Sequence, residues 1–265
     1  CALVKKCDSD AVFCVTTADH VIGREDSFIQ TISDCACLAT SEDVLITMGI
    51  QPVFPSTGFG YIEVGDKWEC DLKTRFYSAI RFVEKPDRQT ATEYMESGSF
   101  FWNSGMFVWS VAALESALLA HTPNLKEMMD RLMPTIGTPG FGEALANEYE
   151  QLERISIDYA VMEKADNIVM ATGDFEWDDI GSWLAIENHF ASDEHGNIKI
   201  GDCESIDAHR NIVMSEDGLV TLLGVDNLIV VRANNSVLIC PKDRAQDVKQ
   251  MVRLLAQKPK YRDLL

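Results

Sequence analysis

Two acidic positions far apart in the chain carry the residue type that holds a divalent cation. Asp19 follows a continuous apolar and β-branched run at residues 11–17, which predicts a parallel strand buried on both faces. Ligands bind beyond the carboxyl ends of strands in open α/β sheets, and Mg²⁺ takes oxygen ligands that it shares with substrate phosphates. Asp179 stands beside Asp178, and in an extended segment one of the two can face such a site. A plain turn or helix cap is the alternative role for each acidic position.

Lys85 is a candidate for holding a phosphate group. It lies at the end of the strand-like segment Phe82–Pro86, and Pro86 restricts its conformation and ends the strand. A lysine presented in this way can serve as a point charge for a phosphate. The alternative is that Glu84 and Lys85 form a surface charge pair of almost no energetic value.

Three further positions have side chains or backbone suited to a sugar. Gly60 lies in a glycine-containing loop that leads into a strand, and such a loop can bring its backbone close to a ligand. Asn103 stands among aromatic residues, and its amide can donate to one hydroxyl and accept from another. Asp158 lies in the first turn of a short helix predicted over 156–165. A simple turn, a polar strand edge and a helix cap are the alternatives.

The elements that must position these residues alternate between strand and helix patterns. Residues 24–40 show apolar positions at helical spacing between strand-like runs at 11–17 and 43–47, which is the βαβ unit of an α/β sheet. Further strands are expected at 61–64, 79–83 and 107–109, and helices at 111–133 and 141–153.

The pattern changes near residue 197. Short β-rich runs follow one another at close spacing and are separated by Asn, Asp and Gly, which predicts a short coil of stacked strands. A helix over 243–257 closes the chain. The sequence therefore predicts one domain at 1–196 and a second, β-rich domain at 197–265.

Composition excludes several classes of protein. The formal net charge of −19 argues against a basic groove for nucleic acid, and no apolar run reaches the length of a membrane span. The eight cysteines show no paired spacing and fall mostly in apolar runs, which is typical of free thiols in a reducing cytoplasm. An acidic protein that handles phosphates needs a metal ion or a few well-placed cations to offset repulsion.

Seven segments, taken in order, resemble the mannose-1-phosphate guanylyltransferase family. They span nearly the whole chain: Thr17–His20, Gly49–Pro52, Thr57–Ile62, Phe82–Pro86, Trp102–Phe107, Ser156–Lys164 and Trp177–Trp183. The resemblance implies a nucleotide-diphospho-sugar transferase fold, which is a Rossmann-like α/β fold with a mixed sheet flanked by helices, and a C-terminal β-helix-like appendage. It implies formation of GDP-mannose and pyrophosphate from GTP and mannose 1-phosphate. We expect a cytoplasmic homodimer that binds neither nucleic acid nor membrane.

The resemblance also implies roles for single residues. The family's metal-binding aspartates fall on Asp19 and Asp179, which would hold Mg²⁺, and its sugar-phosphate lysine falls on Lys85. Gly60, Glu84 and Asn103 would line the sugar pocket, and we add Asp158 as a further candidate. The hypothesis requires the two aspartates and the lysine to converge.

One feature of the family is not found in this sequence. The family begins with a glycine-rich, arginine-containing loop of the type GGxGxRxxPxS that wraps the triphosphate, and no such motif occurs here. Cys1 opens directly into residues typical of a domain interior. We therefore expect that an N-terminal part of the domain, with the loop, precedes this sequence, and that the chain by itself lacks a complete GTP site.

Other functions remain open at this stage. The same chemistry on glucose 1-phosphate or another sugar phosphate, with another nucleotide, is the nearest. A non-catalytic sugar-nucleotide-binding paralogue belongs to another class, and a metal-dependent glycosyltransferase would also use paired acidic residues on an α/β sheet. Pyrophosphate release from a panel of sugar phosphates and nucleotides separates these functions.

Overall fold

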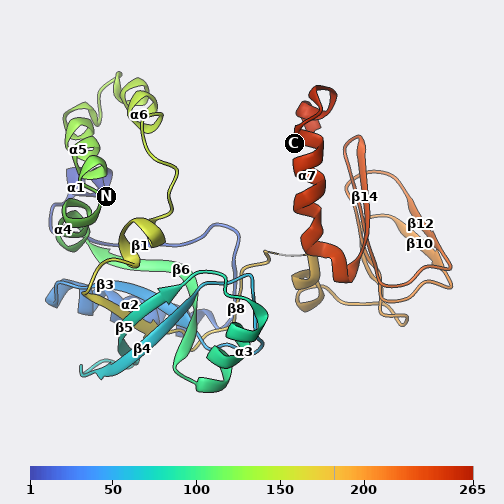
Figure 1. The fold of residues 1–265 in the computed structure, drawn as a ribbon, viewed down its shortest axis with the longest axis horizontal. Helices are drawn as coiled ribbons and strands as arrows, with labels where there is room; N and C mark the ends of the chain where they lie inside the picture. The colour runs from blue at the N-terminus through green and yellow to red at the C-terminus, as the bar shows by residue number, and fades with distance from the viewer. Residues whose placement is uncertain (182, 265) are drawn as a thin grey trace. The chain divides into compact units, whose positions relative to one another are not determined.

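The computed structural model describes residues 1–181 and 183–264, with the backbone alone for 262–264. Ser182, within the last of the resembling segments, lies outside the described residues. The chain forms two compact units, Cys1–Trp177 and Asp178–Leu265 (Figure 1). Each unit has its own core and is described by itself.

The first unit is built on a mixed six-stranded sheet in the order β1-β6-β3-β7-β5-β4. The strands are β1 (Val12–Val15), β3 (Leu45–Ile50), β4 (Tyr61–Trp68), β5 (Phe76–Val83), β6 (Phe100–Ser110) and β7 (Ile168–Thr172). β3 and β7 are parallel, while the other pairs are antiparallel. The long strand β6 also pairs with β4, placing Tyr61 opposite Trp102. The predicted α/β class with a mixed sheet is confirmed.

The buried strands are the central ones. All residues of β3 and β7 are buried, as continuous apolar runs predict. The prediction for residues 11–17 was wrong both in its pairing and in its burial: β1 is antiparallel to β6, only half-buried, and lies at one end of the described sheet. An apolar run carries no information on the direction of the neighbouring strand or on the strand's position in the sheet.

Helices cover the sheet on both faces. The helices of this unit are α1 (Ala2–Cys7), α2 (Glu25–Ser41), α3 (Arg88–Ser97), α4 (Val111–His121), α5 (Pro123–Leu132) and α6 (Phe141–Tyr149). α2 buries Cys35, Leu38 and Ala39 in the core formed by β3 and β6. α1, α4, α5 and α6 gather together on the other side (Figure 1). The single helix predicted over 111–133 is divided at Thr122, because Pro123 has no N–H to continue the helix.

Short elements complete the two units. They are the two-residue strands β2 (Val21–Ile22) and β8 (Trp177–Asp178), the 3₁₀ segments η1 (Met133–Thr135), η3 (Trp183–Asn188), η4 (Lys242–Asp247) and η5 (Pro259–Leu264), and the π-helical turn η2 (Asp158–Met162). β2 and β8 form a separate two-stranded sheet.

The second unit is a short β-helix followed by a helix. Its strands are β9 (Ile198–Ile200), β10 (Cys203–Ile206), β11 (Ile212–Ser215), β12 (Val220–Leu223), β13 (Leu228–Ala233) and β14 (Ser236–Pro241), and its helix is α7 (Val248–Ala256). β9, β11 and β13 stack in parallel, as do β10 and β12. The predicted β-helix-like appendage and terminal helix are confirmed, with the helix shorter than the predicted 243–257 because its first turns are 3₁₀.

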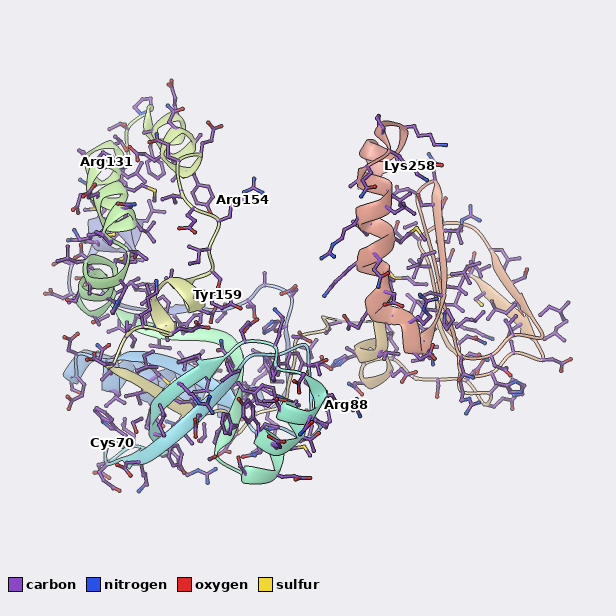
Figure 2. All side chains as sticks on the ribbon, viewed as in Figure 1. Cys70, Arg88, Arg131, Arg154, Tyr159 and Lys258 are labelled. Carbon is purple, nitrogen blue, oxygen red and sulfur yellow. The ribbon has the colours of Figure 1, made fainter. Side chains whose placement is uncertain are left out.

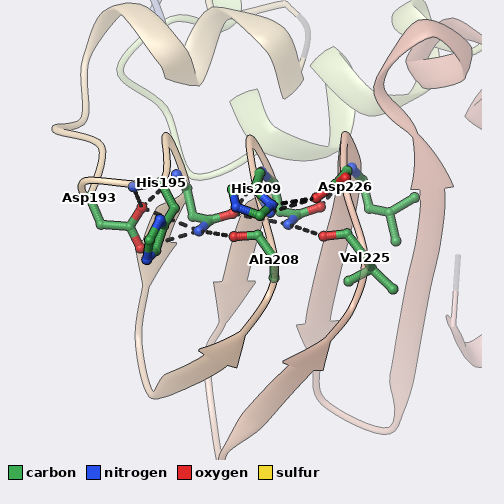
Figure 3. Close-up of polar contacts among 9 residues, drawn as sticks. Asp193, His195, Ala208, His209, Val225 and Asp226 are labelled. Carbon is green, nitrogen blue, oxygen red and sulfur yellow. Dashed lines mark hydrogen bonds and ion pairs between the residues drawn. The ribbon is translucent and has the colours of Figure 1, made fainter.

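Two buried asparagines tie the successive turns of the β-helix together, and Figure 3 labels Ala208 and Val225, whose carbonyls accept from them. The side chain of Asn197 donates to the Ala208 carbonyl at 2.8 Å and accepts from the Asn211 backbone at 3.0 Å. Asn211 in turn donates to the Val225 carbonyl at 2.9 Å and accepts from the Leu228 backbone at 2.9 Å. These hydrogen bonds are buried or partly buried, and the amide side chains satisfy backbone groups at the corners.

Replacing Asn211 by Ala is expected to destabilise the second unit by about 2 kcal/mol, because it removes the side-chain partner of the partly buried N–H of Leu228 and carbonyl of Val225. Hydrogen exchange of the β11 and β13 amides measures the loss. Asn235, an exposed residue, provides the matched control, and its replacement by Ala should leave exchange unchanged. Equal exchange in both variants would contradict this role for Asn211.

Candidate active site

Asn103 is the centre of a polar cluster in the first unit. It lies on β6, and its side-chain amide donates to Asp158 Oδ1 at 2.8 Å. Its Oδ1 accepts from the Gly105 backbone at 3.1 Å and from Thr47 Oγ1 at 3.3 Å, while its own N–H donates to the Gly60 carbonyl at 2.8 Å. The side chain is therefore held in one orientation by partners from separate parts of the chain.

The carboxylate of Glu84 packs against Gly60 in the same polar cluster. A Cβ added to Gly60 would lie 2.5 Å from Glu84 Oε2 and 3.6 Å from the Cβ of Asn103. The missing side chain of Gly60 thus makes room for the carboxylate. The other oxygen of Glu84, Oε1, accepts from Lys85 Nζ at 2.7 Å. Glu84 is half-buried, and its carboxylate lies between the glycine backbone and the ammonium.

Lys85 has an unusual backbone conformation. Its φ is +46°, in the left-handed region that non-glycine residues rarely adopt. Backbone strain of this kind is concentrated at functional sites. The hydrogen bond to Glu84 is the main cause that raises the pKa of the Lys85 ammonium, and burial opposes it. Lys85 is therefore positively charged at neutral pH, and its side chain is 59% exposed.

The π-helical turn η2 carries Asp158 and Tyr159, and Glu163 follows it directly as its C-cap. The Glu163 N–H donates to the Asp158 carbonyl at 2.8 Å, five residues back, which is the π-helical pattern. Ala160, Val161 and Met162 are buried on its inner side. Tyr159 is exposed (Figure 2). Burial raises the pKa of Glu163, and the negative charges of Glu84 and Asp158 raise it further. Sequence predicted an ordinary helix here, since residue types do not distinguish the two.

Asp19 lies on an exposed turn that follows β1. The next residue, His20, accepts a hydrogen bond at Nδ1 from the Trp177 indole at 2.9 Å, and the two rings meet edge to face. Trp177 also contacts Phe59, and Phe59 contacts Trp102. The bond between His20 and Trp177 joins segments 157 residues apart, and no pattern in the sequence predicts it.

The adjacent carboxylates at 178 and 179 differ in their surroundings. Asp178 accepts from the Ile180 backbone, from Asn188 and from His189 at 2.9 to 3.1 Å. Burial acts to raise the pKa of Asp178, but these hydrogen bonds outweigh it and lower the pKa. Asp179 is half-buried and accepts a hydrogen bond from the Gly181 backbone at 2.9 Å. The carboxylate of Asp178 is therefore occupied by hydrogen bonds to neighbouring residues. With its one hydrogen bond to Gly181, Asp179 retains oxygen lone pairs for a ligand.

The structure brings five of the predicted site residues together within the first unit: Gly60, Glu84, Lys85, Asn103 and Asp158. Asp19 also belongs to the first unit, whereas Asp179 belongs to the second. Among the described residues no group of three or more His, Cys, Asp or Glu side chains is arranged as a metal cage. The chemistry of the two aspartates nevertheless suits Mg²⁺, which commonly keeps several waters and takes only one or two carboxylates besides substrate phosphates.

Comparisons with known proteins define the class. Residues 2–196 match the family model for nucleotidyl transferases, and residues 201–255 match the model for the MannoseP isomerase/GMP-like beta-helix domain. The chain therefore belongs to the nucleotidyl transferase family.

Within the part of the chain that the structure describes, no helix is both long and apolar enough to cross a membrane.

Among individual proteins, the relatives are mannose-1-phosphate guanylyltransferases. Mannose-1-phosphate guanylyltransferase 2 of Escherichia coli O157:H7 is 31% identical over 258 residues, which is 96% of this chain and 53% of that protein. The mannose-1-phosphate guanylyltransferase of Klebsiella pneumoniae is 34% identical over 249 residues, 94% of this chain and 52% of that protein. The chain thus spans about half the length of the curated relatives it matches.

Two solved structures are also similar to this chain. A structure described as a mannose-1-phosphate geranyltransferase from Thermus thermophilus has a TM-score of 0.82 at 32% identity, covering 96% of this chain and 72% of that one. The mannose-6-phosphate isomerase from Helicobacter pylori has a TM-score of 0.56 at 29% identity, covering 67% of this chain and 66% of that one. The resemblance read from the sequence is confirmed at the level of the family.

Proposed function

We propose that this protein forms GDP-mannose and pyrophosphate from GTP and mannose 1-phosphate. The observation that carries the proposal is the cluster around Asn103, in which carboxylates and an amide that suit sugar hydroxyls lie beside a charged lysine that suits a phosphate. The match of residues 2–196 to the nucleotidyl transferase family supports the reaction type, and the names of the relatives support the substrates.

Each residue of the cluster has a proposed role. The carboxylates of Glu84 and Asp158 accept hydrogen bonds from sugar hydroxyls, and the Gly60 backbone allows the ring to approach closely. The orientation of Asn103 is fixed by its partners, so the amide is organised before the sugar arrives. Lys85, which is paired with Glu84 in the free protein, turns its charge to the phosphate of the bound substrate.

Asp19 and Asp179 are the proposed ligands of one Mg²⁺. Residue type supports the pairing, since both side chains are carboxylates and Mg²⁺ takes oxygen ligands that it shares with substrate phosphates. When bound, the ion would offset the charge of the substrate phosphates in a protein whose net charge is −19.

The proposed chemistry is an in-line displacement. An oxygen of the sugar phosphate attacks the α-phosphorus of GTP, the bond from that phosphorus to the bridging oxygen breaks, and pyrophosphate leaves. No covalent bond to the protein is formed, so the residues act by positioning and by charge. Lys85 holds the attacking phosphate, while the cluster around Asn103 holds the sugar ring.

The test is pyrophosphate release by the full-length protein with GTP, Mg²⁺ and a panel of sugar 1-phosphates. Release that requires mannose 1-phosphate and GTP supports the proposal, and GDP-mannose must form in equal amount. A preference for glucose 1-phosphate or for another nucleotide would transfer the activity to a different sugar-1-phosphate nucleotidylyltransferase. Binding of the nucleotide sugar without release of pyrophosphate from any pair would indicate a non-catalytic paralogue.

Replacing Gly60 by Ala is expected to raise the KM for mannose 1-phosphate about tenfold while changing thermal stability little. The new Cβ would meet Glu84 Oε2 at 2.5 Å, and this flexible end of the side chain can move aside at small cost to the fold. The moved carboxylate then misses the sugar. Gly58→Ala in the same loop is the control, since its Cβ would lie 3.6 Å from Ser56 Oγ. Equal KM values for the two variants would remove Glu84 from the proposed pocket.

Three broader properties belong to the same proposal. The domain boundary at 196/197 is supported by the family models, which match 2–196 and 201–255, whereas the compact units divide at Trp177 and Asp178. A cytoplasmic location is supported by the eight cysteines, all of which are free thiols. We also propose that the protein is a homodimer. We propose that it binds no nucleic acid, because its strongly acidic net charge repels phosphate backbones.

A further inference from the structure

Two histidines stand on consecutive corners of the β-helix. His195 precedes β9 and His209 precedes β11, and each is followed two residues later by one of the corner asparagines, Asn197 and Asn211. The two imidazole rings are in contact, with their centres 5.4 Å apart and their planes at 80°. Both side chains are exposed, at 53% and 50%. Two nitrogen-bearing rings therefore meet at a surface of the second unit that solvent reaches.

The backbone of each histidine is held by a carboxylate and by the neighbouring turn. Asp193 Oδ1 accepts from the His195 N–H at 3.0 Å, and Asp226 Oδ1 accepts from the His209 N–H at 2.9 Å. The Arg210 N–H donates to the His195 carbonyl at 3.1 Å, which joins the two corners directly. The fold therefore sets the separation of the two backbones, and only the side-chain torsions of the histidines remain to be fixed.

Asp226 also fixes the orientation and the tautomer of the His209 ring, which lies between His195 and Asp226 (Figure 3). Asp226 Oδ1 is 2.9 Å from His209 Nδ1. The hydrogen bond from His209 is the main cause that lowers the pKa of Asp226, so the carboxylate is ionised at neutral pH and can only accept. Nδ1 of the neutral ring therefore carries the proton, and Nε2 holds the lone pair that can bind a metal. Histidines that ligate metals are commonly held by a carboxylate in this way.

The spacing of the two rings suits one tetrahedral metal ion. Zn²⁺ binds imidazole nitrogen at about 2.0–2.1 Å with tetrahedral angles, which places the centres of two bound rings about 5.2 Å apart. Neighbouring ligands of a square-planar ion such as Cu²⁺ would bring the centres to about 4.5 Å. The observed 5.4 Å is nearer to the tetrahedral value. Mg²⁺ prefers oxygen ligands, so this pair differs in kind from the site proposed for Asp19 and Asp179.

The charges beside the two rings favour a cation. Glu194 lies 3.6 Å from the ring of His195, and Asp226 lies 2.9 Å from that of His209. Asp193 is neutralised by Lys199 at 3.0 Å. Two carboxylates thus face the imidazoles in a chain whose net charge is −19, and a divalent ion between the rings would offset their repulsion.

We propose that His195 and His209 together bind one Zn²⁺ ion, with Asp226 orienting His209 and with water completing the coordination. Among the described residues no three His, Cys, Asp or Glu side chains are arranged as a metal cage. A site with two protein ligands is therefore an exchangeable one, weaker than a closed structural site with four. The ion would join two successive turns of the β-helix. The inference goes beyond the proposed function and depends on none of the proposed catalytic residues.

Titration of the protein with Zn²⁺, followed through the NMR signals of the histidine rings, tests the site. The signals of His195 and His209 should change together at micromolar Zn²⁺ and saturate at one ion, while that of His121 stays constant. Zn²⁺ bound to the free cysteines moves neither ring, and Mg²⁺ should leave both signals unchanged. Signals that change at different Zn²⁺ concentrations, or only at millimolar Zn²⁺, would overturn the shared site.

Three substitutions test the ligands one at a time. His195→Ala and His209→Ala should each weaken Zn²⁺ binding at the remaining ring at least tenfold, and both remove exposed side chains, so the fold should persist. Asp226→Asn keeps an acceptor for His209 but removes the charge, and it should weaken binding about tenfold. His121→Ala, in the first unit, is the control and should not alter the affinity.

Unchanged affinity at one ring after loss of the other would mean that each histidine binds alone, which would contradict the proposal. Equal weakening by the His121→Ala control would contradict it as well. Unchanged affinity in Asp226→Asn would exclude that carboxylate from orienting His209. Amide hydrogen exchange of β11 monitors the fold of each variant. Because binding is read from the rings themselves, a protein without catalytic activity that passes these tests would leave the zinc site standing.

Discussion

Replacing Asp179 by asparagine in the full-length protein is expected to lower kcat by about 10²–10³-fold and to leave the fold intact. Asparagine has the size of aspartate, and its side-chain oxygen can still accept the 2.9 Å hydrogen bond from the Gly181 backbone. The side chain is half-buried, and asparagine fills the same space. What disappears is one negative charge for the proposed Mg²⁺. Steady-state pyrophosphate release measures kcat, and circular dichroism with thermal unfolding monitors the fold.

The neighbouring residue provides a matched control for this prediction. Asp178 accepts three hydrogen bonds within its own segment, so Asp178→Asn is expected to act on stability, by about 1 kcal/mol, more than on turnover. Asp19→Asn should reproduce the Asp179→Asn effect. The double variant should be little worse than either single one, because residues that act as a unit are not additive.

Metal dependence completes this test. Both single variants should need a higher Mg²⁺ concentration for half-maximal activity than the wild-type protein does, since each removes one carboxylate ligand. Near-normal turnover of Asp179→Asn at limiting Mg²⁺ would remove that residue from the proposed metal site. Losses that multiply in the double variant would show that the two aspartates act separately.

Local patterns predict the parts of the fold that depend on burial alone. The apolar runs that became β3 and β7 are buried at every position, as expected. The same reasoning fails for β1, since an apolar run does not encode whether its neighbour is parallel or antiparallel. Proline at position 123 marks the end of α4 at the residue before it, a break that helical periodicity alone does not predict.

The candidate site shows a different limit. Residue type and order identified Gly60, Glu84, Lys85, Asn103 and Asp158, but each had an ordinary alternative, and only the geometry shows that they form one cluster. The left-handed φ of Lys85 and the π-helical turn at Asp158 depend on tertiary contacts that a local window does not contain. The hydrogen bond between His20 and Trp177 depends on chain segments that meet only in the folded state.

Replacing Lys85 by methionine is expected to lower kcat/KM for mannose 1-phosphate by about 10²–10³-fold. Methionine keeps an unbranched side chain but removes the charge, so the substrate phosphate would enter a cluster of carboxylates without its cation. Lys67→Met, which alters an exposed lysine paired with Glu69, is the control and should leave kcat/KM unchanged. Measurements at low substrate concentration give kcat/KM directly.

The protonation of Lys85 gives this prediction a second readout. The hydrogen bond to Glu84 raises the pKa of the ammonium in the folded protein, so the stability that it contributes is complete below the ordinary lysine pKa of about 10.4. That stability is lost as the pH rises through the folded-state value. Lys85 therefore stays charged from about pH 6 to 9, and the ratio of wild-type to Lys85→Met activity should be constant over this range.

Lys85→Arg should recover part of kcat/KM, because it restores the charge with a broader, planar group. Failure of arginine to improve on methionine would show that position 85 acts through its shape, and a methionine variant within about threefold of wild type would exclude it from the phosphate site.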